Sequence, residues 1–166
     1  MRRTFDPYLP WDKTRNCPVY PCTRNLGGTF NELISQYTLH YRFKGKHCIL
    51  VFPAGFVWDG ASVPRFAWSL INVRPEGNML LPSLIHDVLY RSEGLRNGHG
   101  QSEIPETIAA GKTIFSKDES DHFLVDLMAW TGEYNRIQMR LVYGIVRTFG
   151  HKYWAGAAPD FNNRRG

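Results

Sequence analysis

Alternating apolar and polar residues mark the first half of the chain as strand-forming. "QYTLHYRF" alternates, "KGK" supplies a turn signal, and "HCILVFP" continues with β-branched and aromatic residues. This order predicts a β-hairpin, and "AGFVWDG" predicts a third strand. We therefore expect a small, antiparallel β part over residues 36–60.

Two segments of the second half combine helical spacing with clear end signals. "NMLLPSLIHDVLYRS" has an apolar arc, and its Pro82 falls in the first turn, where proline is tolerated. Farther along, Ser116 and Glu119 form the S-x-x-E of a capping box, and Gly132 is placed to close that helix. Both segments are predicted helices.

A third helix is predicted over residues 133–154 from its apolar spacing. Its expected inward face consists of Ile137, Leu141, Tyr143, Ile145, Val146 and Phe149. Proline and glycine punctuation predicts an irregular arm over residues 1–35, with at most short strands, and an exposed loop over residues 93–111. Strands followed by helices indicate one α+β domain, residues 1–166, in which a small antiparallel sheet packs against about three helices in the part 79–154.

Composition narrows the classes of partner. The net charge of +5 favours an anionic partner such as a lipid headgroup, nucleic acid or an acidic protein, although scattered basic residues also fit a solvated surface. No basic helix has aromatic residues at nucleic-acid-reading spacing, so specific reading of nucleic acid is not expected. The apolar stretches fall short of the ~20 residues of a membrane-spanning helix, and the basic start lacks the apolar core of a signal peptide.

Polar residues on two predicted helices form the main candidate site. His86 and Tyr90 share one shoulder of their apolar arc, one turn apart, and Asp121 borders the inward face of the next helix. A carboxylate there is costly to bury unless it is hydrogen-bonded, so we predict that Asp121 accepts hydrogen bonds from His86 and Tyr90. Three other acids of that helix are expected to reach water: Asp118, Glu119 and Asp126.

Two interpretations of this cluster stay open. A carboxylate on one nitrogen of the His86 ring leaves the other nitrogen free as a general base. Alternatively, the hydrogen bonds only fasten two helices together, at about 1 kcal/mol each. A solvent-open ring would favour the base, and a sealed ring with both nitrogens bonded would favour the fastening role.

Two further acids raise the question of a metal. Asp59 ends a predicted strand in "DGAS", and it could share a hard cation such as calcium with Asp87. The plainer alternative is that Asp59 caps the turn and Arg65 pairs with Asp87.

Four stretches together resemble a known family. "FVWDGASVPR", "LIHDVLYR", "SKDESDHF" and "YGIVRTFGHKYW" resemble the uncharacterised phage and prophage family called domain of unknown function thirteen-fifty-three, built on D-G-x-S-x-P, H-D-x-L-Y and D-x-x-F. The resemblance runs from Gly55 to Trp154. It implies a viral origin, a location in a phage virion or the host cytoplasm, and other virion proteins as partners.

A narrower resemblance concerns chemistry. H-D-x-x-Y with a later Asp is similar to the catalytic core of secreted and viral phospholipases A2. That similarity implies that His86 is the base, Asp87 a calcium ligand, and Tyr90 and Asp121 supports of the histidine. The cysteine that commonly precedes H-D in those enzymes is absent, and "DGAS" would have to replace their glycine-rich calcium loop.

Together these features predict a metal-assisted hydrolase that uses activated water on an ester or phosphoester, with an anionic lipid as one candidate substrate. The alternative is a virion or tail-associated structural or assembly protein in which the cluster only supports the fold. A further alternative is an inhibitor of host defence.

Overall fold

The computed structural model describes residues 5–8, 11–12, 17–18, 20–28, 30–58, 77–95, 108–110, 114–132 and 134–154. Its strands are β1 (Phe5–Tyr8), β2 (Trp11–Asp12), β3 (Cys17–Pro18), β4 (Thr23–Gly27), β5 (Phe30–Leu33), β6 (Tyr37–Phe43), β7 (Lys46–Phe52), β8 (Val57–Trp58) and β9 (Ile108–Ala110). Its helices are α2 (Leu80–Arg91), α3 (Lys117–Thr131) and α4 (Arg136–Phe149), with 3-10 turns η1 (Gly77–Met79) and η2 (Gly150–Tyr153).

Antiparallel pairing organises the strands into three groups. A four-stranded sheet has the order β1-β6-β7-β9, a three-stranded sheet has the order β4-β5-β8, and β2 pairs with β3. The predicted hairpin is β6–β7, and its turn residues Lys44 and Gly45 both have positive φ, 51° and 78°, as tight hairpin turns require. The predicted third strand forms at β8 but pairs with β5 instead of the hairpin.

Strand β1 has a place in the main sheet because its side chains and backbone both find partners. The Phe5 ring stacks on Phe123 of α3 with centroids 4.3 Å apart, and the Phe5 amide donates to Asp126 Oδ2 at 2.8 Å. Asp126 is buried at this contact, so the prediction that it reaches water is wrong. Pro7 is tolerated because β1 is an edge strand. The segment predicted as an irregular arm thus holds short strands that belong to the sheets.

The segment predicted as an exposed loop over residues 93–111 also contains a strand. Ile108–Ala110 forms β9, the edge strand next to β7, with Leu50 opposite Ala109. Three residues are too few to show an alternating pattern, so this pairing could not be predicted from the pattern of residues.

Helices α2 and α3 form as predicted. Pro82 is the third residue of α2, where no intrahelical amide donor is needed. Ser116 and Glu119 make the reciprocal contacts of a capping box at the start of α3, and Gly132 ends that helix in the left-handed conformation with φ of 75°.

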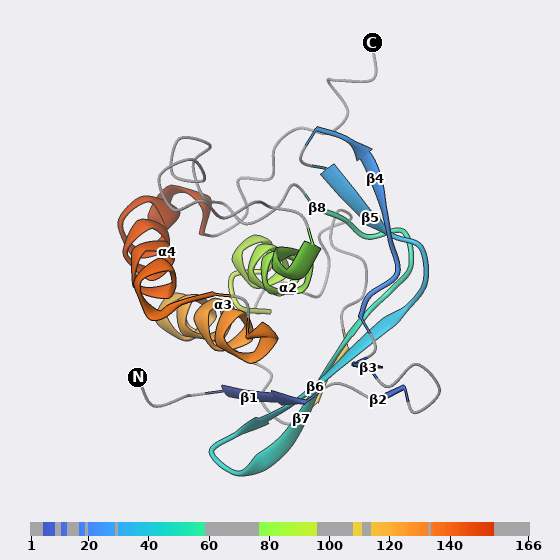
Figure 1. The fold of residues 1–166 in the computed structure, drawn as a ribbon, viewed down its shortest axis with the longest axis horizontal. Coiled ribbons are helices and arrows are strands. Elements are labelled where there is room, and N and C mark those ends of the chain that lie inside the picture. Colours follow the sequence, from blue (N-terminus) through green and yellow to red (C-terminus); the bar gives the residue numbers. More distant parts are fainter. Residues whose placement is uncertain are drawn as a thin grey trace.

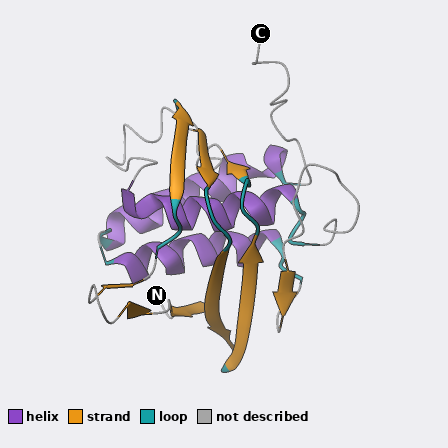
Figure 2. Ribbon diagram, turned by 90° about the vertical axis from the view of Figure 1, so that its right-hand side faces the viewer, coloured by secondary structure: helices purple, strands orange, loops and turns teal. Residues whose placement is uncertain are grey.

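Helix α2 lies between the strands on one side and α3 and α4 on the other (Figure 1). The helices run across the direction of the long strands (Figure 2). The larger hydrophobic core fills the space between α2, α3 and the inner faces of the sheets, and a smaller one joins α3 to α4. This layering confirms the predicted α+β class, with more than one small sheet.

The predicted inward face of α4 is wrong for three of its six residues. Only Val142 and Val146 are buried on this helix. Ile137 is 70% exposed, Leu141 47% and Phe149 42%. The apolar arc of α4 is wider than the surface that α3 offers, because α4 lies at the edge of the helical layer (Figure 1). Two other residues of the predicted face, Tyr143 and Ile145, are partly buried.

Candidate active site

Helix α2 carries polar side chains into the interior because it is covered on both sides. Of its 12 residues, 11 are buried. Near its start, Trp58 Nε1 donates to Ser83 Oγ at 3.2 Å, and that hydroxyl donates to the carbonyl of Leu80 at 3.0 Å. These bonds fix the end of β8 against α2.

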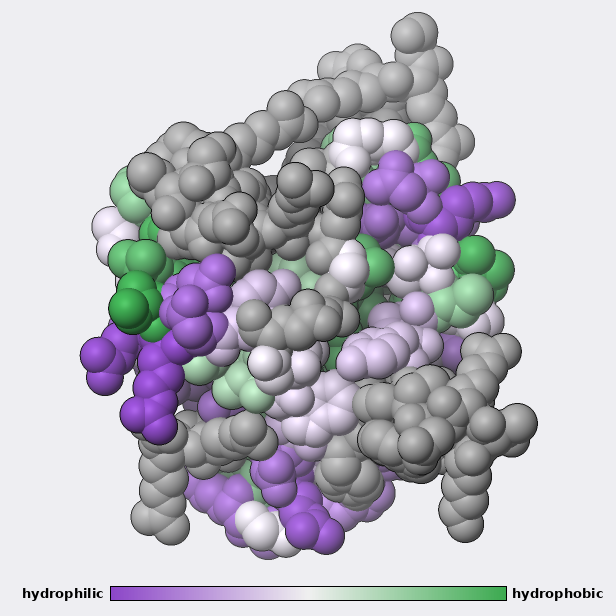
Figure 3. Space-filling view, in the orientation of Figure 1, coloured by the Kyte–Doolittle hydropathy of each residue, from purple (hydrophilic) through white to green (hydrophobic). Residues whose placement is uncertain are grey.

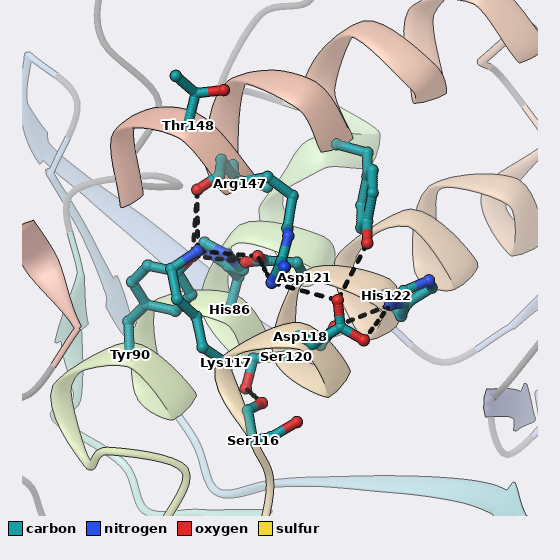
Figure 4. A network of polar contacts seen from close by, with 12 residues as sticks. His86, Tyr90, Ser116, Lys117, Asp118, Ser120, Asp121, His122, Arg147 and Thr148 are labelled. Atoms are coloured by element: carbon teal, nitrogen blue, oxygen red, sulfur yellow. Dashed lines mark hydrogen bonds and ion pairs between the residues drawn. The ribbon is translucent and has the colours of Figure 1, made fainter. Parts of the chain in front are cut away.

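His86 and Tyr90 converge on Asp121 of α3, as the helical spacing predicted (Figure 4). His86 Nε2 lies 3.2 Å from Asp121 Oδ1, and the Tyr90 hydroxyl donates to the same oxygen at 2.5 Å. The two rings are 4.0 Å apart between centroids. The predicted contacts are confirmed, whereas the catalytic roles of these residues remain predictions.

The two nitrogens of the His86 ring have different surroundings. Nε2 faces an ionised carboxylate, which can only accept, so Nε2 carries the proton and donates it. Nδ1 then holds the lone pair, and it is buried without a hydrogen-bond partner in the part of the chain that the structure describes. The ring is 0% exposed. The His86 ring is therefore buried, as expected if it only holds two helices together. It also has an unbonded nitrogen, as expected of a general base.

Two cations complete the cluster around Asp121. Lys117 Nζ lies 2.9 Å from Asp121 Oδ2 and donates to the Val146 carbonyl of α4 at 3.1 Å. Arg147 Nη1 lies 3.5 Å from the same carboxylate oxygen. One carboxylate thus joins side chains from α2, α3 and α4.

The electrostatics set the protonation states. Burial lowers the pKa of His86, and this effect exceeds the opposing effect of the hydrogen bond to Asp121. Burial alone would raise the pKa of Asp121, but hydrogen bonds from His86, Tyr90 and Lys117 outweigh it and lower that pKa. Burial, then the negative charge of Asp121, raises the pKa of the Tyr90 phenol. At neutral pH the cluster holds a neutral imidazole, a neutral phenol and an ionised carboxylate.

A second, partly exposed group of polar residues adjoins the cluster through Arg147 (Figure 4). Arg147 Nη1 lies 3.1 Å from Asp118 Oδ1, which also accepts a 3.1 Å hydrogen bond from the Tyr143 hydroxyl. His122 Nδ1 lies 3.3 Å from the other Asp118 oxygen. The Asp118 side chain is 51% exposed, so this group connects the buried carboxylate of Asp121 to the surface.

Asp87, the predicted calcium ligand, is engaged by a cation of its own helix. Arg91 Nη2 lies 2.8 Å from Asp87 Oδ2, and Arg91 Nη1 donates to the Val57 carbonyl at 3.0 Å. A guanidinium in this position competes with a metal ion for the carboxylate. Asp59, the other predicted ligand, and Arg65, the alternative partner, lie outside the described residues. Across the described ranges, no three His, Cys, Asp or Glu side chains are grouped to hold a metal. The calcium site shared by Asp87 and Asp59 stays a prediction.

Sequence reasoning missed Lys117 and Arg147. Lys117 stands four residues before Asp121, a spacing at which oppositely charged helix residues meet, so the sequence contained that signal. Arg147 comes from α4, and its approach to Asp121 depends on how α3 and α4 pack. The packing of α4 on α3 cannot be predicted from neighbouring residues in the sequence.

Comparisons with known proteins identify a family but no activity. No curated protein and no solved structure gives a significant match to the chain. A family model matches residues 34–146, which is more than half of the chain and includes His86, Tyr90 and Asp121. The protein therefore belongs to the family described as "Protein of unknown function (DUF1353)".

Proposed function

We propose that this protein is a hydrolase that activates water with His86 and cleaves an ester or phosphoester. The observation that carries the proposal is the contrast within one ring: Nε2 is held by Asp121, while Nδ1 is unprotonated, buried and has no partner among the described residues. Leaving a buried acceptor unsatisfied costs about 1–3 kcal/mol, and such groups call for an explanation in reactivity or in a bound molecule.

The proposed chemistry uses the cluster as it stands. His86 Nδ1 removes a proton from water, and the water oxygen forms a bond to the carbonyl carbon or phosphorus of the substrate. The bond to the leaving alcohol then breaks, and the imidazolium returns the proton to the alcohol oxygen. Asp121 stabilises the imidazolium and holds the ring in one orientation, a role that Tyr90 supports through its 2.5 Å hydrogen bond.

Because the ring is 0% exposed, the reaction requires an opening movement that brings water and substrate to Nδ1. Reaction with diethyl pyrocarbonate measures that opening directly. We expect His86 to be modified more slowly than the partly exposed His122, and a substrate analogue to protect it further.

The decisive experiment compares two histidine variants on chromogenic carboxylic and phosphoric esters. His86→Asn is expected to lower kcat/KM by about 10²–10⁴-fold. His122→Asn, on the exposed side of α3, is the matched control and should leave the rate unchanged. Equal activity of His86→Asn and the natural protein would rule out His86 as the base.

The pH profile supplies a second readout. A general base works only when it is neutral, and burial lowers the pKa of His86 from the ordinary 6.5. The acidic limb of kcat/KM is therefore expected below pH 6.5, with full activity at and above neutrality.

A role for calcium at Asp87 and Asp59 stays a prediction. In that case Arg91 would have to release Asp87, whose carboxylate it contacts at 2.8 Å. Loss of activity in a chelator and in Asp87→Asn, with recovery on adding calcium, would support the metal. Unchanged activity in the chelator would rule out a role for calcium, and the proposed role of His86 would stand.

A second candidate function is favoured by the complete burial of Asp121 and its contacts with side chains of α2, α4 and its own helix. In this alternative the cluster is structural, and the protein is a virion or tail-assembly component. It predicts that substitutions at His86 lower the free energy of unfolding, while the natural protein turns over neither class of ester. A host-defence inhibitor remains a further proposal without a feature of its own.

A further inference from the structure

Helix α4 leaves large apolar side chains in solvent along one side. Ile137 and Leu141 are one turn apart on this side and are 70% and 47% exposed. Phe149, near the end of the helix, is 42% exposed but lies closer in angle to Val142 than to Ile137. The opposite side, with Val142 and Val146, packs on α3. Figure 3 shows hydrophobic surface at the left edge of the molecule, over α4. Grouped exposed apolar residues of this kind commonly mark a contact surface.

Cations border this apolar side. Arg136 and Arg140 directly precede Ile137 and Leu141, and both are exposed. Neither arginine has an ion-pair partner in the described ranges, and α4 contains no Asp or Glu. His151 and Lys152 follow the helix and are also exposed. Hydrophilic and hydrophobic surfaces lie next to each other over α4 (Figure 3).

The same side is open at its middle. Gly144 lies between the apolar and basic rows, and a methyl group added there would meet nothing within 4 Å. The 14 residues of α4 span about 21 Å. No helix among the described residues has the length and apolarity needed to cross a bilayer. An extended amphipathic face of this kind is suited to lying along a surface.

We infer that α4 docks on an anionic lipid bilayer, with Ile137 and Leu141 entering below the headgroups and Arg136 and Arg140 contacting the negative charges. An interfacial helix combines an apolar side, a basic border and low overall hydrophobicity, and this combination is present on α4. A second copy of the chain is the alternative occupant of this side, and sedimentation velocity distinguishes it from a lipid surface. The inference is independent of the proposed hydrolysis at His86.

The test measures binding of the full chain to sucrose-loaded vesicles by co-sedimentation. Vesicles of phosphatidylglycerol and phosphatidylcholine in equal parts are compared with vesicles of phosphatidylcholine alone. The natural protein is expected to bind the anionic vesicles at least 10-fold more tightly, and binding should weaken as salt rises.

Two double variants separate the contributions. Arg136→Gln with Arg140→Gln should lower the affinity about 30-fold, from about 1 kcal/mol for each charge near the lipid surface. Ile137→Ser with Leu141→Ser should lower it at least 10-fold. These residues are exposed, so thermal unfolding should show that all variants remain folded.

Matched controls come from strands and turns outside α4. Ile34 is 54% exposed beyond β5, and Lys44 and Lys46 are exposed at the β6–β7 turn. Ile34→Ser, and Lys44→Gln with Lys46→Gln, should bind vesicles as the natural protein does. Equal binding to both vesicle types, no binding, or equal losses in the controls would overturn the inference.

Sedimentation velocity decides between a lipid and a second copy of the chain. A concentration-dependent dimer that disappears in Ile137→Ser with Leu141→Ser would overturn lipid docking in favour of self-association. A failure of lipid binding would leave the His86 proposal standing, because chromogenic ester hydrolysis is measured without lipid.

Discussion

Helices α2 and α4 have apolar residues at similar spacing, but the rest of the protein covers α2 almost completely and α4 on one side only. On α2, 11 of 12 residues are buried, including His86 and Asp87, whereas on α4 only Val142 and Val146 are buried out of 14 residues. The difference follows from position: α2 lies between the strands and α3, and α4 touches the rest of the described chain mainly through α3 (Figure 1).

This difference decides what polar residues can do on each helix. A polar side chain on α2 must find a protein partner or remain unsatisfied, and the cluster around Asp121 meets that requirement for Tyr90 and for one nitrogen of His86. Polar side chains on α4 can face water. Helix α4 nevertheless supplies Arg147 and the Val146 carbonyl to the buried cluster, so its inner side supports α2 while its outer side stays open.

The largest expected effect comes from removing the charge that holds the covered helix in place. Asp121→Asn leaves Lys117, whose side chain is 9% exposed, without its buried counter-charge. We expect the free energy of unfolding to fall by about 3–5 kcal/mol, measured by urea denaturation. The matched control is Asp118→Asn on the same helix, whose side chain is 51% exposed and should cost about 1 kcal/mol or less. Equal losses in the two variants would mean that burial does not distinguish the two carboxylates.

An intermediate effect is expected where the end of α4 touches α2. A methyl group at Gly150 would lie 2.5 Å from the Tyr90 hydroxyl and 3.0 Å from its ring. Gly150→Ala should therefore displace Tyr90 from Asp121 and cost about 1–3 kcal/mol of unfolding free energy.

A double-mutant cycle isolates that contact. Tyr90→Phe removes the hydroxyl that the new methyl group meets, so the combined variant should lose less stability than the sum of the two single variants. Strict additivity would show that Gly150 acts through some other contact.

The sequence predicted features that depend on neighbouring residues and missed those that depend on packing. The capping box of Ser116 and Glu119 and the end at Gly132 are local, so the limits of α3 were predictable. The contacts of His86 and Tyr90 with Asp121 were predictable because the helical spacing of each segment places these side chains at the border of its apolar face.

Other features needed information from distant parts of the chain. The place of β1 beside β6 and the burial of Asp126 under the Phe5 amide join residues more than 30 and 100 positions apart. On α4, spacing identified the helix but could not report that its neighbour covers only one side. The exposed positions of Ile137 and Leu141 were therefore predicted wrongly.

The smallest expected effect tests the open side of α4 itself. Gly144 is in the interior of the helix, where glycine costs up to about 1 kcal/mol relative to alanine, and a methyl group there would meet nothing within 4 Å. Gly144→Ala should therefore raise the free energy of unfolding by up to about 1 kcal/mol, measured by thermal and urea denaturation. Gly150→Ala, the same change at the covered end, has the opposite expected sign. A loss of stability in Gly144→Ala would show that this side of α4 is occupied in the folded protein, and the contrast between a covered α2 and a half-covered α4 would fail.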